Sequence, residues 1–333
     1  MLRTALITGS AGFIGYFTAQ ALLANGWQVV GLDAMTDYYD VSLKEKRRAM
    51  LRKSSGYTDI EARLETPAVL KNLFEQHRFD AVIHLAAQAG VRHSIEAPRS
   101  YVEANLIGTF ELLEAARAFP PSHMLLASTS SAYGANTAMP YCENDKSDHQ
   151  MSFYAATKKA TENMAHSYAH LYRLPITMFR FFTVYGPWGR PDMAHFKFTK
   201  AILNGDPINI YNHGDMRRDF TFIDDLTASI LALIDVVPGS VPVEGDSLSP
   251  VAPHRIVNIG NGAPVELMDF IAAIEKACGR AAIKTFHGMQ PGDVPATWAD
   301  ASLLRELTGQ RPQTSVQDGI NAFVGWYREY YQL

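Results

Sequence analysis

A glycine-rich turn near the start of the chain restricts the possible folds more than any other feature. The segment TGSAGFIG places Gly9, Gly12 and Gly15 between an apolar strand-like run, RTALI, and a helix-like run, FIGYFTAQALLANG. Glycines at this spacing permit a tight turn and let backbone N–H groups and the helix N-terminus approach a pyrophosphate. The order of strand, glycine turn and helix therefore predicts a dinucleotide-binding βαβ unit.

The strand expected after this helix indicates which dinucleotide binds. The run WQVVGLD ends in Asp33. A carboxylate there would hydrogen-bond the adenosine ribose hydroxyls and repel a 2′-phosphate, so it favours NAD over NADP. A helix-capping turn beside a solvated aspartate is the alternative interpretation of the two elements.

Strand-like and helix-like segments alternate through the first half of the chain. Short runs such as FDAVIHLAA, SHMLLAS and LPITMFRF are separated by longer amphipathic stretches. This alternation predicts an α/β fold with a doubly wound parallel sheet. After about Phe181 the chain becomes richer in Gly and Pro. We therefore expect a Rossmann domain over 1–180, with returning segments near 218–237 and 255–278, and a smaller C-terminal α/β substrate domain formed mainly by 181–333.

Composition excludes several classes of function. The 333 residues are 47% hydrophobic and 19% charged, which suits a globular protein with a substantial core. A net charge of -4 offers no basic surface for nucleic acid or an anionic membrane. The longest apolar run, near ASILALIDVV, is short for a membrane span and contains Asp235. Cys142 and Cys278 lie far apart, so we expect no disulfide or zinc site and a cytoplasmic location.

The segment YAATK supplies a candidate proton acceptor. Tyr154 and Lys158 are four residues apart in a helix-like stretch, so both side chains lie on one helix face. A free tyrosine is a poor base at neutral pH, but a nearby ammonium and a positively charged nicotinamide both favour the phenolate. Tyr154 can then accept a proton. Without the glycine turn, an ordinary amphipathic helix would be the better interpretation.

Five segments together resemble the extended short-chain dehydrogenase/reductase family of nucleotide-sugar enzymes: TGSAGFIG, HLAAQAGVRHS, STSSAYG, YAATK and RDFTFIDD. The resemblance covers nearly the whole chain. Within that family, RFFTVYGPWGRPDMA followed by QPGDVPATWAD most resembles the enzymes that epimerise UDP-glucuronate at C4.

The resemblance implies a tightly held NAD and a set of residues around it. Adenine would lie between Asp59 and Ile60. The other implied cofactor contacts are Gly9, Gly12, Phe13, Ile14, Gly15, Asp33, Leu85, Ala86, Ala87, Asn105, Ser128, Tyr154 and Lys158. Tyr154, Lys158 and Thr129 would be catalytic.

The hydroxyl-rich segment STSSAYG bears on the reaction. In such enzymes the position of Thr129 is a Ser or Thr that hydrogen-bonds the sugar 4-oxygen, so the resemblance implies that Thr129 shares a proton with Tyr154. Relatives that dehydrate a sugar or decarboxylate a uronic acid carry acidic residues at the positions of Ser130 or Ser131. With serine at both positions, there is no carboxylic acid to carry a proton at C5 or C6 of the sugar. This pattern favours epimerisation over dehydration or decarboxylation.

A uronic acid substrate creates a further requirement. Oxidation at C4 gives a β-keto acid that can lose carbon dioxide, and hydroxyls that hold the carboxylate out of alignment with the carbonyl π system would protect it. Ser130, Ser131 and Thr183 are candidates for this role. Galactose-type epimerases, which the chain also resembles, carry asparagine at the position of Thr183, so threonine favours glucuronate. A threonine that bonds the backbone at a strand end is the alternative interpretation.

The nucleotide half of the substrate would meet charged residues. By resemblance, Arg190, Arg218 and Asp293 face the UDP-sugar, and arginine suits a diphosphate through forked, charge-assisted contacts. Arg92 would lie near the sugar, with a surface ion pair as the alternative. A basic stretch, Lys44, Lys46, Arg47, Arg48, Arg52 and Lys53, is expected to be a solvated helix face.

Other assignments remain open at this point. His166 and His170 have the spacing of two metal ligands on one helix turn, but no third ligand is evident, so no metal is expected. By analogy with relatives, the helices around 99–119 and 152–172 would form a homodimer. The alternatives are a 4-epimerase of neutral UDP-sugars or another nucleotide-sugar enzyme of the family, and a scaffold that only binds dinucleotide. The scaffold would be expected to lose the tyrosine, lysine or threonine, and all three are present.

Overall fold

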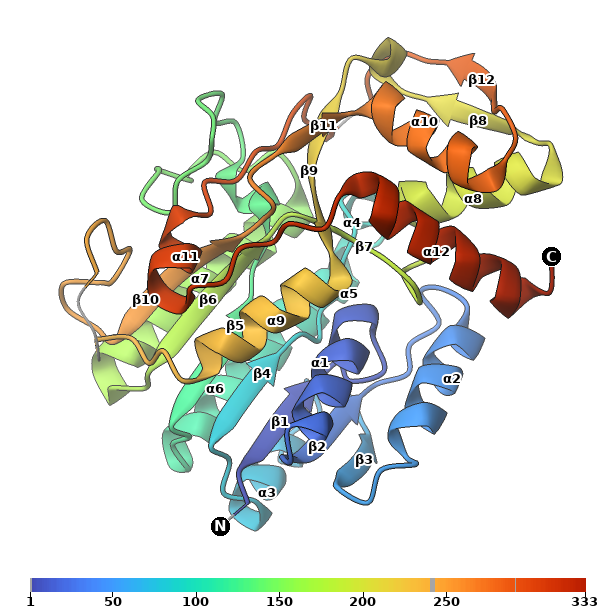
Figure 1. Ribbon diagram of the computed structural model, residues 1–333. Helices are drawn as coiled ribbons and strands as arrows, with labels where there is room; N and C mark the ends of the chain where they lie inside the picture. Colours follow the sequence, from blue (N-terminus) through green and yellow to red (C-terminus); the bar gives the residue numbers. More distant parts are fainter. Residues whose placement is uncertain (1, 240–242, 291) are drawn as a thin grey trace.

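A parallel sheet forms the centre of the computed structural model, which describes residues 2–239, 243–290 and 292–333 (Figure 1). Within these residues, seven strands pair in the order β10-β6-β5-β4-β1-β2-β3, and every pairing is parallel. The strands are β1 (Thr4–Thr8), β2 (Gln28–Asp33), β3 (Tyr57–Glu61), β4 (Ala81–His84), β5 (His123–Ala127), β6 (Ile176–Phe181) and β10 (His254–Ile259). The strand order reverses between β1 and β4, where ligands bind in folds of this kind.

Helices cover both faces of this sheet, so its central strands are buried on both sides and mostly apolar. Every residue of β5 and β6 is buried. One face packs against α1 (Phe13–Ala24) and α9 (Ile223–Ile234), and the other against α3 (Val69–Gln76), α6 (Gly108–Ala118) and α7 (Phe153–Tyr172). The predicted α/β fold with a doubly wound parallel sheet is confirmed.

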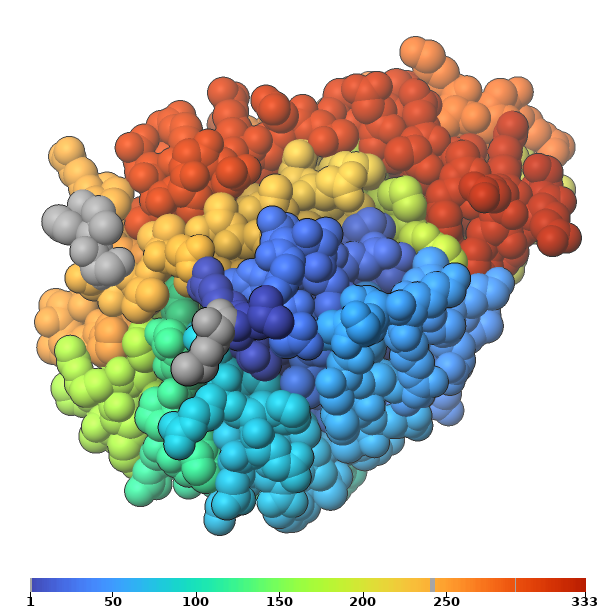
Figure 2. All heavy atoms as spheres, turned by 60° about the horizontal axis from the view of Figure 1, so that its bottom comes forward, coloured from blue at the N-terminus to red at the C-terminus, as the bar shows by residue number. Residues whose placement is uncertain are grey.

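The C-terminal half of the chain returns to this sheet and also builds the upper part of Figure 1. Strand β10 pairs with β6, and α9 packs on α1. Figure 2 shows this from below: the yellow atoms of the segment that contains α9 lie beside the blue N-terminal atoms. The division into a Rossmann domain and a substrate domain stays a prediction.

Smaller elements complete the described part of the chain. The additional strands are β7 (Thr183–Tyr185), β8 (Pro207–Ile210), β9 (Arg217–Phe222), β11 (Pro264–Glu266) and β12 (Ile283–Phe286), which pair in the orders β11-β9-β7 and β12-β8. The additional helices are α2 (Val41–Leu51), α4 (His93–Glu96), α5 (Pro98–Tyr101), α8 (Ala194–Asn204), α10 (Leu267–Cys278), α11 (Ser302–Thr308) and α12 (Val316–Tyr331). A π-helical segment η1 (Val102–Ile107) precedes α6, and η2 (Ser130–Tyr133) and η3 (Asn212–Gly214) are short 3-10 turns. Among the described residues, no helix combines the length and apolar character needed to cross a membrane.

Candidate active site

The glycine turn joins β1 to α1 at the carboxyl edge of the sheet, and its close packing requires glycine. Gly9 adopts a φ of +75°, and a Cβ there would lie 2.8 Å from the Ala86 amide nitrogen. A Cβ on Gly15 would lie 2.0 Å from the Gly9 carbonyl oxygen. Gly12 precedes α1 and provides no side-chain cap, so the first amides of the helix remain available to a ligand.

Asp33 ends β2 beside this turn. Its carboxylate accepts hydrogen bonds from the amide of Ala11 in the turn, at 3.1 Å, and from the amide of Met35, at 2.8 Å. These bonds hold the carboxylate at the edge of a cavity that runs along the carboxyl ends of the strands. Asp33 therefore lies in the cavity wall, and its contact with a ribose stays a prediction.

This first cavity contains most of the predicted cofactor contacts. Its lining includes Gly9, Gly12, Phe13, Ile14, Gly15, Asp33, Leu85, Ala86, Ala87, Ser128, Thr129, Tyr154, Lys158 and Arg190. The remaining wall includes Thr36, Tyr38 and Tyr39 from the segment after β2, and Lys44 from α2. None of the four was among the predicted cofactor contacts, although the place of the first three just after a strand at the ligand edge was a usable signal.

Three predicted cofactor residues lie outside the cavity wall. Asp59 and Ile60 lie within β3, and the Asp59 carboxylate is paired with Arg48 and Arg52. The cavity is lined instead by residues 62–65, which come just after the strand. Asn105 is buried and holds the Gln88 backbone, accepting from its amide at 2.8 Å and donating to its carbonyl oxygen at 3.1 Å. It supports the wall through Gln88.

The basic stretch over 44–53 is not a solvated face, and that expectation was wrong for three of its members. Lys44, Arg47 and Arg48 are buried. The guanidinium of Arg47 donates to the Ala11 carbonyl oxygen at 2.8 Å and to the Trp188 carbonyl oxygen at 2.7 Å. Arg47 thus ties the glycine turn to the segment that carries Arg190, and a charge count alone does not reveal such a contact.

Tyr154 and Lys158 share one face of α7 at the inner end of the first cavity. Burial raises the pKa of Tyr154, while a side-chain hydrogen bond with Thr129 and the charge of Arg190 lower it. Burial lowers the pKa of Lys158 to about 8, and Glu162 opposes this change. The Lys158 ammonium donates to the Ala127 carbonyl oxygen at 2.7 Å. The arrangement can exchange a proton at the tyrosine oxygen.

Thr129 lies between the end of β5 and η2. It precedes η2 in extended conformation, and its Oγ1 accepts from the Ser131 amide at 3.2 Å. This bond starts the turn and fixes the threonine hydroxyl near Tyr154. This turn therefore directs Thr129 toward the first cavity, and Ser130 and Ser131 toward a second cavity.

The second cavity collects the other hydroxyls of the prediction. Ser130, Ser131 and Thr183 line it together with Arg218 and Asp293. In the described part of the chain, none of the three hydroxyls has a hydrogen-bond partner, so each is free to bind a ligand. Ser128 differs, because its hydroxyl donates to Glu162 at 2.6 Å.

Charged groups around the second cavity are partly paired. Arg218 donates to the carbonyl oxygens of Val294 and Pro295, at 2.6 Å and 3.0 Å. Arg92 forms an ion pair with Asp293 at 3.0 Å and does not line either cavity. Arg190 pairs with Asp192 at 2.6 Å and lines the first cavity. The predicted substrate residues thus lie in or beside two adjoining cavities.

The two histidines of α7 have other partners. His166 is 2.8 Å from the Ser249 hydroxyl, and His170 is 3.0 Å from the Val251 carbonyl oxygen. Among the residues that the structure describes, no cluster of His, Cys, Asp or Glu could hold a metal ion.

A glycine-turn dinucleotide cradle with a tyrosine–lysine pair at its inner end defines the class of protein. The chain belongs to the NAD dependent epimerase/dehydratase family, whose profile matches residues 5–260. Over 332 residues it is 55% identical to a protein of Rhizobium meliloti named "Probable UDP-glucuronate 4-epimerase", covering 98% of this chain and 97% of that protein.

Solved structures agree with this class. The UDP-glucuronic acid 4-epimerase of Bacillus cereus, in complex with UDP-glucuronic acid and NAD, is similar with a TM-score of 0.88 and 33% identity, covering 98% of this chain and 100% of that one. The UDP-glucose 4-epimerase of Thermotoga maritima with UDP-glucose is similar with a TM-score of 0.86 and 26% identity, covering 98% and 99%. The resemblance to nucleotide-sugar enzymes is confirmed.

Proposed function

We propose that this protein interconverts UDP-glucuronate and UDP-galacturonate by reversible oxidation at C4 of the sugar. NAD, when bound, supplies the chemistry of accepting the C4 hydride and returning it to the opposite face of the sugar. The residues present fit this cofactor, because a Cβ would collide at Gly9 and Gly15 and Asp33 stands at the ribose end. The sequence relatives and the complex with UDP-glucuronic acid and NAD support the same reaction.

Tyr154 is proposed to take the proton of the sugar 4-hydroxyl. Lys158 favours the phenolate by its charge, and Thr129 hydrogen-bonds the 4-oxygen between the two transfers. When hydride returns, Tyr154 gives the proton back, so the reaction consumes nothing overall. Because the same groups act in both directions, the sugar needs only to turn within the cavity.

The observation that carries the choice of glucuronate is the set of free hydroxyls in the second cavity. Ser130, Ser131 and Thr183 have no other partner in the described part of the chain and lie beside Arg218. Such a group suits a carboxylate, which accepts hydrogen bonds and carries negative charge. Held there, the carboxylate would be kept from the orientation in which carbon dioxide leaves the β-keto acid.

The proposal is tested by giving the purified protein UDP-glucuronate and UDP-glucose separately and resolving the products by NMR. We expect UDP-galacturonate from the first and little turnover of the second. Conversion of UDP-glucose alone would favour the neutral-sugar alternative, which the similarity to the Thermotoga maritima enzyme keeps open.

We also propose that two copies associate through α6 and α7, in the cytoplasm. Large apolar side chains are exposed on and beside these helices, including Ile107, Phe110, Phe153 and Leu171, which are 41% to 62% exposed. Large apolar side chains exposed along two helices favour an interaction surface there. Sedimentation of the wild type should show a dimer, and Phe110→Asp should shift it to monomer. A monomeric wild type would refute this assembly.

A further inference from the structure

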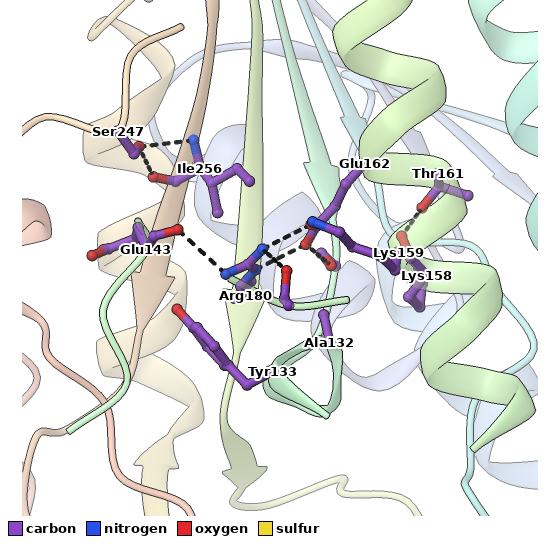
Figure 3. Close-up of polar contacts among 12 residues, drawn as sticks. Ala132, Tyr133, Glu143, Lys158, Lys159, Thr161, Glu162, Arg180, Ser247 and Ile256 are labelled. Carbon is purple, nitrogen blue, oxygen red and sulfur yellow. Dashed lines mark hydrogen bonds and ion pairs between the residues drawn. The ribbon is translucent and has the colours of Figure 1, made fainter. Parts of the chain in front are cut away.

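Glu162 lies one helix turn beyond Lys158 on α7 and is the centre of a buried polar network. Its carboxylate accepts from the Ser128 hydroxyl at 2.6 Å, from Arg180 Nε at 2.9 Å and Nη2 at 2.8 Å, and from Lys159 Nζ at 3.1 Å. Figure 3 shows the Arg180 guanidinium, from β6, pointing at Glu162 on the helix. The side chains of Glu162 and Arg180 are only 2% and 1% exposed.

A buried ion pair does not by itself stabilise a fold more than apolar residues of the same volume would, because both charges lose their hydration. The contacts of this pair indicate another role. Three successive turns of α7 hold three neighbouring residues at and just after the end of β5: Tyr154 meets Thr129, Lys158 binds the carbonyl oxygen of Ala127, and Glu162 binds Ser128.

We propose that Glu162 is a positioning residue for the reaction centre. It holds Ser128 so that Thr129 faces Tyr154, and its negative charge keeps Lys158 protonated. The inference rests on the proposed function, because that function gives Tyr154, Lys158 and Thr129 their roles. Glu162 itself does not line the first cavity, so it acts through its neighbours.

Glu143 faces Arg180 from the side away from Glu162, and burial raises its pKa to about 7, so it ionises within the working pH range. Two buried histidines near this network stay neutral there. His84, from β4, faces Lys158, and burial lowers the pKa of His84 to about 3. His254, from β10, faces Glu162, and burial lowers its pKa to about 4. Burial opposes ionisation of Glu162, but the hydrogen bonds and charge of Arg180 outweigh it and lower the Glu162 pKa to about 2.

The charges that act on Lys158 above pH 6 are therefore few. Glu162 is its one nearby anion in the described part of the chain, while Arg180 and Lys159 are cations paired with that anion. Removal of the negative charge should lower the Lys158 pKa further, because the buried ammonium loses its counter-charge and the Arg180 charge is no longer balanced.

The test measures kcat for epimerisation between pH 6 and 10, NAD retained after gel filtration, and thermal unfolding. In Glu162→Gln, loss of activity at high pH should begin about one pH unit lower than in the wild type, since an adjacent opposite charge moves a pKa by one unit or more. Glu162→Asp keeps the charge, so its high-pH loss should coincide with that of the wild type. If Glu162→Gln folds and its activity is lost at the same high pH as that of the wild type, the proposal is overturned.

Ser128→Ala tests the positioning separately, because it leaves the ion pair intact. We expect kcat to fall about tenfold with the pH of the high-pH loss unchanged, since one hydrogen bond to a charged group is removed. Thr161→Val is the matched control: Thr161 is buried on the same turn, and among the described residues its hydroxyl bonds only the Lys158 carbonyl oxygen, at 2.7 Å, so kcat should stay within about twofold.

An unchanged kcat in Ser128→Ala would overturn the proposal even if Glu162→Gln failed to fold. A purely structural role predicts lower thermal stability in all Glu162 variants with no change in the pH profile. If the wild type does not convert UDP-glucuronate, the proposed function fails instead, and the same comparison is made with whichever UDP-sugar it epimerises.

Discussion

Thr183→Val is predicted to let part of the 4-keto intermediate lose carbon dioxide, while the shape of the site stays nearly unchanged. Thr183 begins β7 and lines the second cavity, where its hydroxyl has no partner in the described part of the chain. Valine has the same branched outline but cannot donate to a carboxylate. The variant therefore removes one hydrogen bond and little else.

The size of the effect follows from that bond. A hydrogen bond to a charged group contributes about 1.5–3 kcal/mol, so its loss should change the partition between epimerisation and loss of carbon dioxide by roughly ten- to a hundredfold. Decarboxylation of the β-keto acid yields carbon dioxide and a UDP-4-keto-pentose, and the hydride stays on the cofactor as NADH.

Carbon dioxide release and absorbance from NADH are the assays, with UDP-glucuronate as substrate. The matched control is Thr221→Val on the neighbouring strand β9, because Thr221 pairs with Val184, is buried, and has an unpartnered hydroxyl that lines neither cavity. We expect leakage from Thr183→Val and from Ser131→Ala, and none from the control. Purely epimeric product from both site variants would refute the carboxylate argument.

Three further predictions concern the base, the cofactor and the fold. Tyr154→Phe should lower kcat by at least a hundredfold while NAD stays bound, because only proton transfer is lost; near-normal turnover would contradict the mechanism. Denatured protein should release NAD and not NADP, as measured by enzymatic cycling, since Asp33 lines the cavity and is predicted to meet the adenosine ribose; mostly NADP would contradict this. Burial raises the pKa of Glu143 from 4.5 to about 7. The folded protein therefore loses stability as the pH rises between these values, because the unfolded chain releases the Glu143 proton more readily. Glu143→Gln should therefore raise the unfolding temperature at pH 8 but not at pH 4, and equal effects at both would contradict the assignment.

Much of the fold and the centre of the site could be predicted from local sequence. The glycine turn and the apolar alternation reflect backbone sterics and strand burial, which act over a few residues. Tyr154 and Lys158 are fixed by helix periodicity, and Asp33 by its place at a strand end. These features need no knowledge of distant contacts.

The sequence was least informative where distant segments meet. Asp59 and Ile60, predicted to flank adenine, lie two to six residues before the wall residues 62–65, because the exact end of β3 depends on its pairing with β2. The burial of Arg47 depends on Trp188, which is 141 residues away in the sequence. Similarly, the role of Glu162 depends on Arg180 from β6 and on Ser128, which follows β5.

The most direct test of the whole account is the fate of UDP-glucuronate itself. Purified protein, with the cofactor it retains, is incubated with UDP-glucuronate alone, and the anomeric proton signals are followed by NMR to equilibrium. We expect UDP-galacturonate to appear with no carbon dioxide, no net NADH and no added cofactor. Unchanged UDP-glucuronate, or a decarboxylated pentose as the main product of the wild type, would contradict it.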